Sequence, residues 1–116
     1  MRKSALVFMR PELTILQPDR TLTRDALSKR AAVCQQFFEA CLSQQADWDW
    51  AMKGVWYSKH FRQCLESSPV NVARCVRLGR SAQRRFRCSQ PPELATLGKD
   101  VVKWIYREHG DSGRAA

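Results

Sequence analysis

Apolar side chains recur along this chain at alternating steps of four and three residues, and this spacing restricts the fold more than any other feature. The first series consists of Leu27, Ala31, Cys34, Phe38 and Cys41. Because an α-helix repeats every 3.6 residues, these side chains share one face and form a seam against a partner helix. We predict a helix from about Thr23 to about Gln45.

The same spacing predicts a second helix, which follows two closely spaced aspartates. Asp47 or Asp49 is suited to cap its N-terminus, because a carboxylate accepts hydrogen bonds from the free amide groups of a first helical turn. Its seam is formed by Trp50, Gly54, Tyr57, Phe61 and Cys64, and the apolar face is widened by Trp48, Val55 and Trp56. We therefore expect a helix crowded with aromatic rings.

Prolines set the expected bounds of two further helices. Ser67, Ser68 and Pro69 supply a stop, a cap and a first-turn proline, so we predict that the third helix starts at Pro69 and ends before Pro91 and Pro92. Its apolar stripe is formed by Val72, Cys75, Leu78, Ala82 and Phe86. A fourth helix, ending near Gly110, has an apolar side formed by Leu94, Leu97, Val101, Trp104 and Ile105.

These elements predict an all-α domain, a small helical hairpin or bundle of three to four helices with an extended N-terminal arm. The arm, residues 1–22, holds β-favouring runs broken by Pro11 and Pro18. Residues 23–110 form the helical domain and residues 111–116 a polar tail. A chain of 116 residues fits one such core. Its longest apolar run, residues 5–9, is too short to span a membrane or to act as a secretory signal, so we expect neither.

Positive charge is concentrated in one segment of the chain. The formal net charge is +9, and residues 67–88 hold six arginines and no acidic residue. These arginines, which we predict to form an electrostatic contact, are Arg74, Arg77, Arg80, Arg84, Arg85 and Arg87. Guanidinium groups bind phosphates and carboxylates, so nucleic acid, anionic lipid headgroups and acidic protein subunits are all candidate partners. A basic face that is merely solvated is the alternative.

Aromatic residues are concentrated in the second predicted helix. We predict a protein interface at Trp48, Trp50, Trp56, Tyr57 and Phe61. Large rings bury much area at small entropic cost, so they often anchor interfaces. A core built from rings is the alternative interpretation.

Four of the five cysteines lie on predicted helical seams. Cys34 and Cys41 are seven positions apart, and Cys64 and Cys75 are eleven apart, on either side of the turn at residues 67–71. Two bridges among five cysteines allow 15 patterns. One option is a bond between Cys64 and Cys75 across a helical hairpin, with Cys88 as the odd thiol. Reduced cysteines that pack as small hydrophobes are the alternative.

Two cysteines on each of two helices, with rings three residues away, resemble the coiled-coil-helix-coiled-coil-helix (CHCH) family of mitochondrial proteins. The rings are Phe37 after Cys34, Phe38 before Cys41 and Phe61 before Cys64, and the resemblance covers about residues 33–76. This chain has C-x6-C and C-x10-C where typical members have C-x9-C twice. The resemblance implies oxidation in the intermembrane space, with disulfides joining Cys34 to Cys75 and Cys41 to Cys64.

The sequence offers little support for catalysis or metal binding. It contains no P-loop, no dinucleotide-binding glycine motif and no H-E-x-x-H. There is no C-x2-C, and His60 and His109 lie outside zinc-finger spacing. His60 precedes Cys64 by four residues, but a core cysteine beside a half-exposed histidine is far commoner than a catalytic dyad. We therefore expect no catalytic residue, no cofactor and no metal, and a protein that is not an enzyme.

Taken with the family resemblance, these features predict a non-catalytic accessory or structural subunit of a large mitochondrial inner-membrane assembly, such as a respiratory-chain complex or ATP synthase. It would lie peripherally on the intermembrane-space side and hold neighbouring protein subunits. The alternative is a basic nucleic-acid-binding protein, either a mitochondrial ribosomal subunit in the matrix or a bacterial or phage regulator in the cytoplasm. Binding of nucleic acid that weakens steeply with salt would favour the alternative.

Overall fold

The computed structural model describes residues 22–44, 47–89 and 91–110, and within them it contains four α-helices and no strand. The helices are α2 (Arg24–Ser43), α3 (Trp48–Glu66), α4 (Val72–Phe86) and α5 (Glu93–His109). The all-α class is thereby confirmed. The predicted arm, apart from Leu22, and the predicted polar tail lie outside the described residues.

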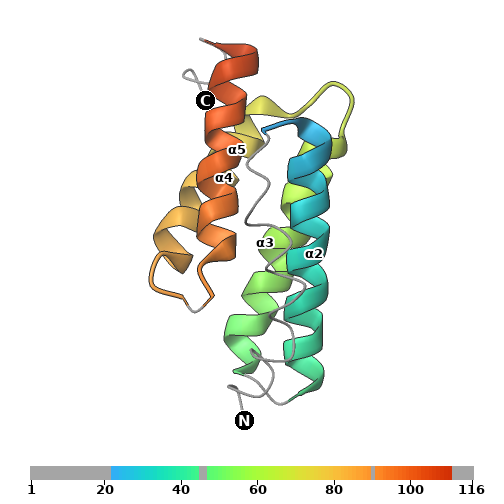
Figure 1. Ribbon diagram of the computed structural model, residues 1–116, viewed down its shortest axis with the longest axis vertical. Helices are drawn as coiled ribbons and strands as arrows, with labels where there is room; N and C mark the ends of the chain where they lie inside the picture. Colours follow the sequence, from blue (N-terminus) through green and yellow to red (C-terminus); the bar gives the residue numbers. More distant parts are fainter. Residues whose placement is uncertain (1–21, 45–46, 90, 111–116) are drawn as a thin grey trace.

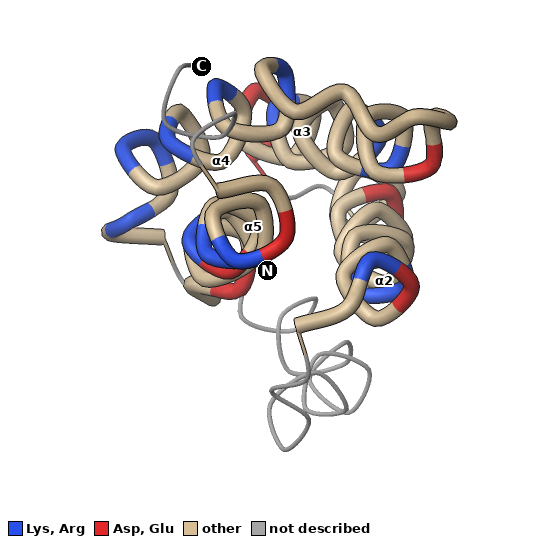
Figure 2. The backbone as a smooth tube through the Cα atoms, turned by 90° about the horizontal axis from the view of Figure 1, so that it is seen from above, with Lys and Arg blue, Asp and Glu red and all other residues tan. Residues whose placement is uncertain are grey.

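The helices form two antiparallel hairpins that lie side by side (Figure 1). α2 packs mainly against α3, and α4 packs mainly against α5. Contacts between the two hairpins come chiefly from α3 with α4 and from α2 with α5. The result is an up-and-down four-helix bundle, seen end-on in Figure 2.

Short polar side chains start three of the helices. Thr23 Oγ1 accepts a hydrogen bond from the amide of Ala26 at 3.1 Å, and Asp47 Oδ1 accepts one from the amide of Trp50 at 3.0 Å. Each satisfies one of the amide groups that a first helical turn leaves free. The predicted cap at Asp47 is therefore confirmed.

The prediction that the third helix starts at Pro69 is wrong. α4 begins at Val72, and Asn71 caps it by accepting a hydrogen bond from the amide of Arg74 at 3.2 Å. Pro69 lies in the turn before the helix, after a cis peptide bond. The turn is organised around the Ser67 hydroxyl, which donates to the Pro69 carbonyl at 3.0 Å and accepts from the Asn71 amide at 3.1 Å. These bonds hold the chain out of the helical path until Asn71.

The predicted helical seams form the core. Every residue of the α2 and α5 series is buried, and so are most of those of α3 and α4. The exceptions in these seams are Trp50 and Val72, which are half-buried. Trp48 and Trp56, expected to widen the apolar face of α3, are 65% and 49% exposed. α3 contacts α2 and α4, and these two rings lie on a side that neither neighbour covers.

α4 and α5 approach each other closely at a pair of glycines. A Cβ atom on Gly79 would lie 2.7 Å from the carbonyl oxygen of Gly98, and one on Gly98 would lie 2.6 Å from that of Gly79. Only a residue without a side chain permits this separation, because neither backbone can move independently of its helix. The glycine pair therefore sets the distance between the two helices.

A buried ion pair joins the two hairpins. Arg30 of α2 donates from Nη1 to Asp100 Oδ2 of α5 at 2.9 Å, and both residues are 7% exposed. Neither was identified from the sequence, because Arg30 occupies a position next to the apolar seam without any motif around it. Each charge compensates the other where water is excluded, so the pair depends on both members.

Candidate functional site

The aromatic residues predicted as one interface divide between the core and the surface. Phe61 and Tyr57 are 0% and 6% exposed, so they are core residues and are not available to a partner. Trp50 is half-buried, and its ring packs edge-on against Phe38 at a centroid distance of 4.9 Å. Of the predicted set, only Trp48 and Trp56 lie on the surface. Burial follows from the side of α3 on which each ring falls.

The exposed rings form a stripe with one residue that sequence reasoning missed. Met52 lies midway between Trp48 and Trp56 at steps of four residues, and it is 39% exposed. These three, here called the aromatic stripe, are the only large hydrophobic residues exposed in the part of the chain that the structure describes. At 1.5 Å per residue the stripe extends about 12 Å along α3. The i, i+4, i+8 spacing was the signal that could have identified it.

Local contacts hold Trp56 in place. Its ring stacks on the His60 imidazole at a centroid distance of 4.0 Å and meets the Tyr57 ring edge-on at 5.0 Å. His60 Nδ1 is in turn hydrogen-bonded to the backbone carbonyl of Trp56 at 2.7 Å. His60 thus contacts Trp56 through both its ring and its Nδ1 atom. A ring fixed in this way loses little further conformational entropy when a partner covers it.

Two open hollows lie between α3 and α4, one near each end of the aromatic stripe. The first, of about 270 Å³, is lined by Trp56, Tyr57, Arg74, Arg77, Leu78 and Ser81. The second, of about 350 Å³, is lined by Asp47, Asp49, Trp50, Lys53, Arg85 and Phe86. Both are wide open to solvent, unlike the enclosed clefts in which proteins bind small molecules.

The six predicted arginines do not form a single patch. Arg74, Arg77 and Arg85 border the two hollows beside α3. Arg80 points to the other neighbour, donating to the Tyr106 hydroxyl of α5. The remaining two, Arg84 and Arg87, are exposed. The arginines therefore wrap around the outer side of α4, and only some of them adjoin the aromatic stripe.

The arginines of α4 are not neutralised within the described part of the molecule. The ion pairs there join Arg30 to Asp100, Lys53 to Asp49, Arg62 to Glu66 and Arg107 to Glu108, and none includes a residue of α4. In Figure 2 the basic segments of α4 lie on the side of the molecule opposite α2. Arg85 shares its hollow with Asp47 and Asp49, whereas the hollow beside Arg74 and Arg77 contains no acidic side chain, so the positive charge at that end favours an acidic partner.

The cysteines also separate into distinct environments. Cys34 and Cys41 are buried in α2, Cys64 and Cys75 meet between α3 and α4 with their sulfurs 2.9 Å apart, and Cys88 is exposed. Burial, aided by Glu93 and opposed by Arg30, raises the pKa of Cys34 from 9.0 to about 12. Burial also raises the pKa of Cys41. A buried thiol with a raised pKa is a poor nucleophile, so neither residue of α2 is suited to catalysis.

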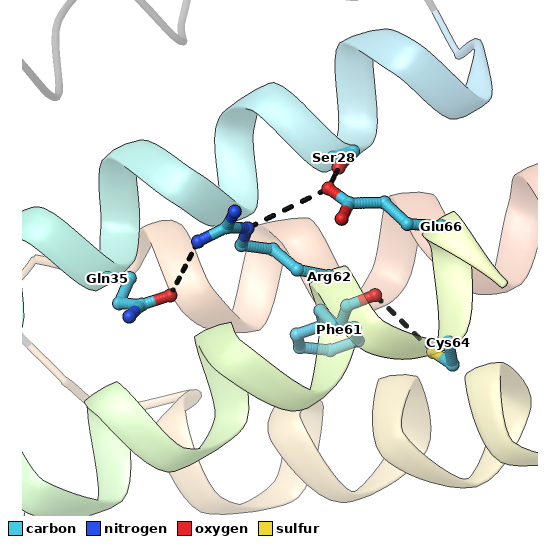
Figure 3. A network of polar contacts seen from close by, with 6 residues as sticks. All are labelled: Ser28, Gln35, Phe61, Arg62, Cys64 and Glu66. Carbon is cyan, nitrogen blue, oxygen red and sulfur yellow. Dashed lines mark hydrogen bonds and ion pairs between the residues drawn. The ribbon is translucent and has the colours of Figure 1, made fainter.

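A polar cluster links α2 and α3 on the side shown in Figure 3. Arg62 Nη1 donates to the side-chain oxygen of Gln35 at 3.1 Å, and Arg62 Nε lies 3.7 Å from a carboxylate oxygen of Glu66. Glu66 also accepts a hydrogen bond from the Ser28 hydroxyl. Exposed contacts of this kind add little stability.

The described residues contain neither a candidate metal site nor a candidate membrane-spanning helix. No group of three or more histidine, cysteine or acidic side chains there is placed to hold a metal ion. None of the four described helices is long and apolar enough to cross a membrane. Comparison of the chain with protein-family models, curated proteins and solved structures finds no match.

Proposed function

We propose that this protein is a non-catalytic binding module whose α3–α4 face receives an acidic, amphipathic helical segment of another protein. The observation that carries the proposal is the aromatic stripe of Trp48, Met52 and Trp56 beside Arg74 and Arg77, which form no ion pair in the described structure and whose hollow contains no acidic side chain. Apolar side chains of the partner would cover the stripe, and its carboxylates would reach the arginines of α4.

The composition of the face supports a protein partner. Tryptophan and arginine are the residues that most often dominate protein interfaces, and methionine adapts to partners of different shape. The stripe repeats every four residues along about 12 Å, which matches the apolar repeat of a helix laid alongside. Arg74 and Arg77, next to Trp56 in the first hollow, are placed to pair with carboxylates at the border of the contact.

Selection from a phage-displayed library of random 16-residue peptides tests the proposal and requires no identified partner. We expect selected peptides to carry Leu, Phe or Trp at helical spacing and an excess of Asp and Glu. Binding should weaken at least tenfold in the double variant Trp48→Ala/Trp56→Ala, measured by fluorescence anisotropy of labelled peptides. Peptides without an acidic bias, or peptides that bind this variant equally well, would contradict the proposal.

Matched charge reversals test the electrostatic half. Arg74→Glu/Arg77→Glu should abolish binding of the selected acidic peptides. Lys99→Glu/Lys103→Glu, which changes the net charge equally at exposed positions on α5, should reduce binding only slightly. A fluorescent 20-nucleotide RNA serves as the competing class. RNA binding that is stronger than peptide binding and independent of Trp48 and Trp56 would favour the nucleic-acid alternative.

The cellular setting suggested by the CHCH resemblance stays part of the proposal. In that setting the acidic helix would belong to a subunit of a mitochondrial inner-membrane assembly, and the module would hold it on the intermembrane-space side. Fractionation of mitochondria from the source organism, with protease protection of the intact chain, tests the location. Recovery outside mitochondria would remove the setting and leave the binding proposal unaffected.

A further inference from the structure

The two cysteines at the junction of α3 and α4 are placed to react with each other. Cys64 Sγ and Cys75 Sγ are 2.9 Å apart, and the two residues are 1% and 0% exposed. This separation is within about 1 Å of the length of a disulfide bond, about 2.0 Å. Very little movement would therefore convert the contact into a covalent bond.

The backbone holds this pair in place from both sides of the turn. The amide of Asn71 donates to the carbonyl of Cys64 at 3.3 Å, and the amide of Cys75 donates to the carbonyl of Asn71 at 3.0 Å. The Ser67 hydroxyl oxygen also lies 2.9 Å from the same Cys64 carbonyl oxygen, so its single proton is shared between this carbonyl and that of Pro69. The juxtaposition of the sulfurs thus follows from the path of the main chain through residues 67–71.

We propose that Cys64 and Cys75 form a disulfide that clasps the end of α3 to the first turn of α4, while Cys34, Cys41 and Cys88 stay thiols. This pairing differs from the one that the CHCH resemblance implies, in which Cys75 bonds to Cys34 and Cys64 to Cys41. Each sulfur can form only one such bond, so the two patterns exclude each other. The inference rests on contacts separate from those of the aromatic stripe.

The reaction is thiol–disulfide exchange with a donor disulfide, either a small molecule such as oxidised glutathione or a protein disulfide. The Cys64 thiolate attacks a donor sulfur, forming a mixed disulfide and releasing one donor thiolate. The Cys75 thiol then loses its proton and attacks Cys64 Sγ, forming the Cys64–Cys75 bond and releasing the second donor thiolate. Two protein thiols are oxidised, and one donor disulfide is reduced to two thiols.

The order of attack follows from the hydrogen bonds of the pair. Cys75 donates its thiol proton to Cys64 Sγ, and Cys64 donates to the Phe61 carbonyl at 3.5 Å (Figure 3). The hydrogen bond from Cys75, together with the nearby Arg74, lowers the pKa of Cys64, whereas the same bond and burial raise that of Cys75. Cys64 is therefore the first nucleophile.

Tryptic mapping of the full chain tests the pairing directly. The protein is equilibrated with oxidised and reduced glutathione, quenched with acid, alkylated and digested. Cleavage after Arg62, Arg74 and Arg77 places Cys64 in peptide 63–74 and Cys75 in peptide 75–77, whereas Cys34 and Cys41 share peptide 31–53. We expect peptide 63–74 linked to peptide 75–77, with all other cysteines alkylated. A link from peptide 31–53 to either of these peptides, or no link at any redox ratio, would overturn the proposal.

Thermal unfolding supplies a second test that needs no variant. The bond closes a short loop, so the oxidised wild-type protein should unfold at a Tm on the order of 10 °C above the reduced one. Cys75→Ser should lose this redox-dependent shift, and Cys41→Ser, a matched buried cysteine of α2, should keep it. An equal Tm for oxidised and reduced wild type, or a shift that survives in Cys75→Ser, would contradict the inference.

Discussion

The two hairpins of this molecule are held together in different ways. Between α2 and α3 the contact is made by large rings, with Phe38 packed over Gly54 so closely that a Cβ atom there would lie 2.3 Å from the Phe38 ring. Between α4 and α5 the closest approach is between the backbones, at Gly79 and Gly98. A helix that packs through large rings needs apolar residues on several sides. A helix that approaches its neighbour through glycines needs fewer, so most of its surface is available for polar residues.

This difference explains where the proposed binding surface lies. Because α4 uses small residues for its contact with α5, it can carry five arginines on its remaining surface and still be part of the core. α3 carries more rings than its neighbours cover, and the surplus appears as the aromatic stripe. The binding face that we propose is formed where the ring-rich hairpin meets the basic one.

The largest expected effect on stability comes from the Arg30–Asp100 ion pair at the junction between the hairpins. Replacement of Asp100 by Ala leaves the Arg30 guanidinium buried without its carboxylate, so we expect a loss of about 3–5 kcal/mol in the free energy of unfolding. Urea denaturation followed by circular dichroism measures the loss. As a control, Glu108→Ala removes an exposed ion pair with Arg107 and should cost less than about 1 kcal/mol. Equal losses in the two variants would show that burial does not set the strength of the Arg30 pair.

Replacing a glycine by alanine in each hairpin compares the two kinds of helix contact. Gly98→Ala places a methyl group against the carbonyl of Gly79, which cannot move away, and we expect it to cost about 2–3 kcal/mol. Gly54→Ala places the same group 2.3 Å from Cγ of the buried Phe38 ring, an atom that rotation of the ring does not move, so its cost should be at least as large. Both substitutions gain the same helical propensity, so the difference reports the contact alone. A smaller loss for Gly54→Ala than for Gly98→Ala in denaturation experiments would contradict this expectation.

The smallest expected effect is a dependence of stability on pH that originates at Cys34. Its pKa is raised from 9.0 to about 12 in the folded protein, so the folded state keeps this proton when the unfolded state loses it. Stability from this group is therefore complete below about pH 9 and declines as the pH rises toward 12. Between pH 8 and pH 10 the decline should be about 1 kcal/mol.

Comparison with Cys34→Ala isolates this contribution. The variant lacks the ionisable thiol, so its stability should fall by about 1 kcal/mol less than that of the wild type over the same interval. Urea denaturation at pH 8 and pH 10, under reducing conditions, provides both values. Parallel pH profiles for the variant and the wild type would show that Cys34 does not keep its proton in the folded chain.

The helical architecture follows from the sequence because it depends on local periodicity. The series from Leu27 to Cys41 and from Leu94 to Ile105 repeat with the period of a helix, and both are buried as predicted. Asp47 was one of two aspartates identified as candidate caps for the same reason, since a capping side chain acts within three residues of its own position. At Ser67–Asn71, by contrast, several polar residues compete for the same amide groups, and the start of α4 was misplaced.

The local sequence pattern specifies which residues are helical, which face of each helix is apolar, and where positive charge accumulates. The packing of the helices determines which rings stay on the surface and which arginines lie beside them. It also brings Arg30 to Asp100 and Cys64 to Cys75. The physical reason is the distance along the chain over which each interaction acts. Helix formation and capping depend on neighbours a few residues away, whereas burial, ion pairing and sulfur contact depend on how helices distant in sequence are arranged around one another.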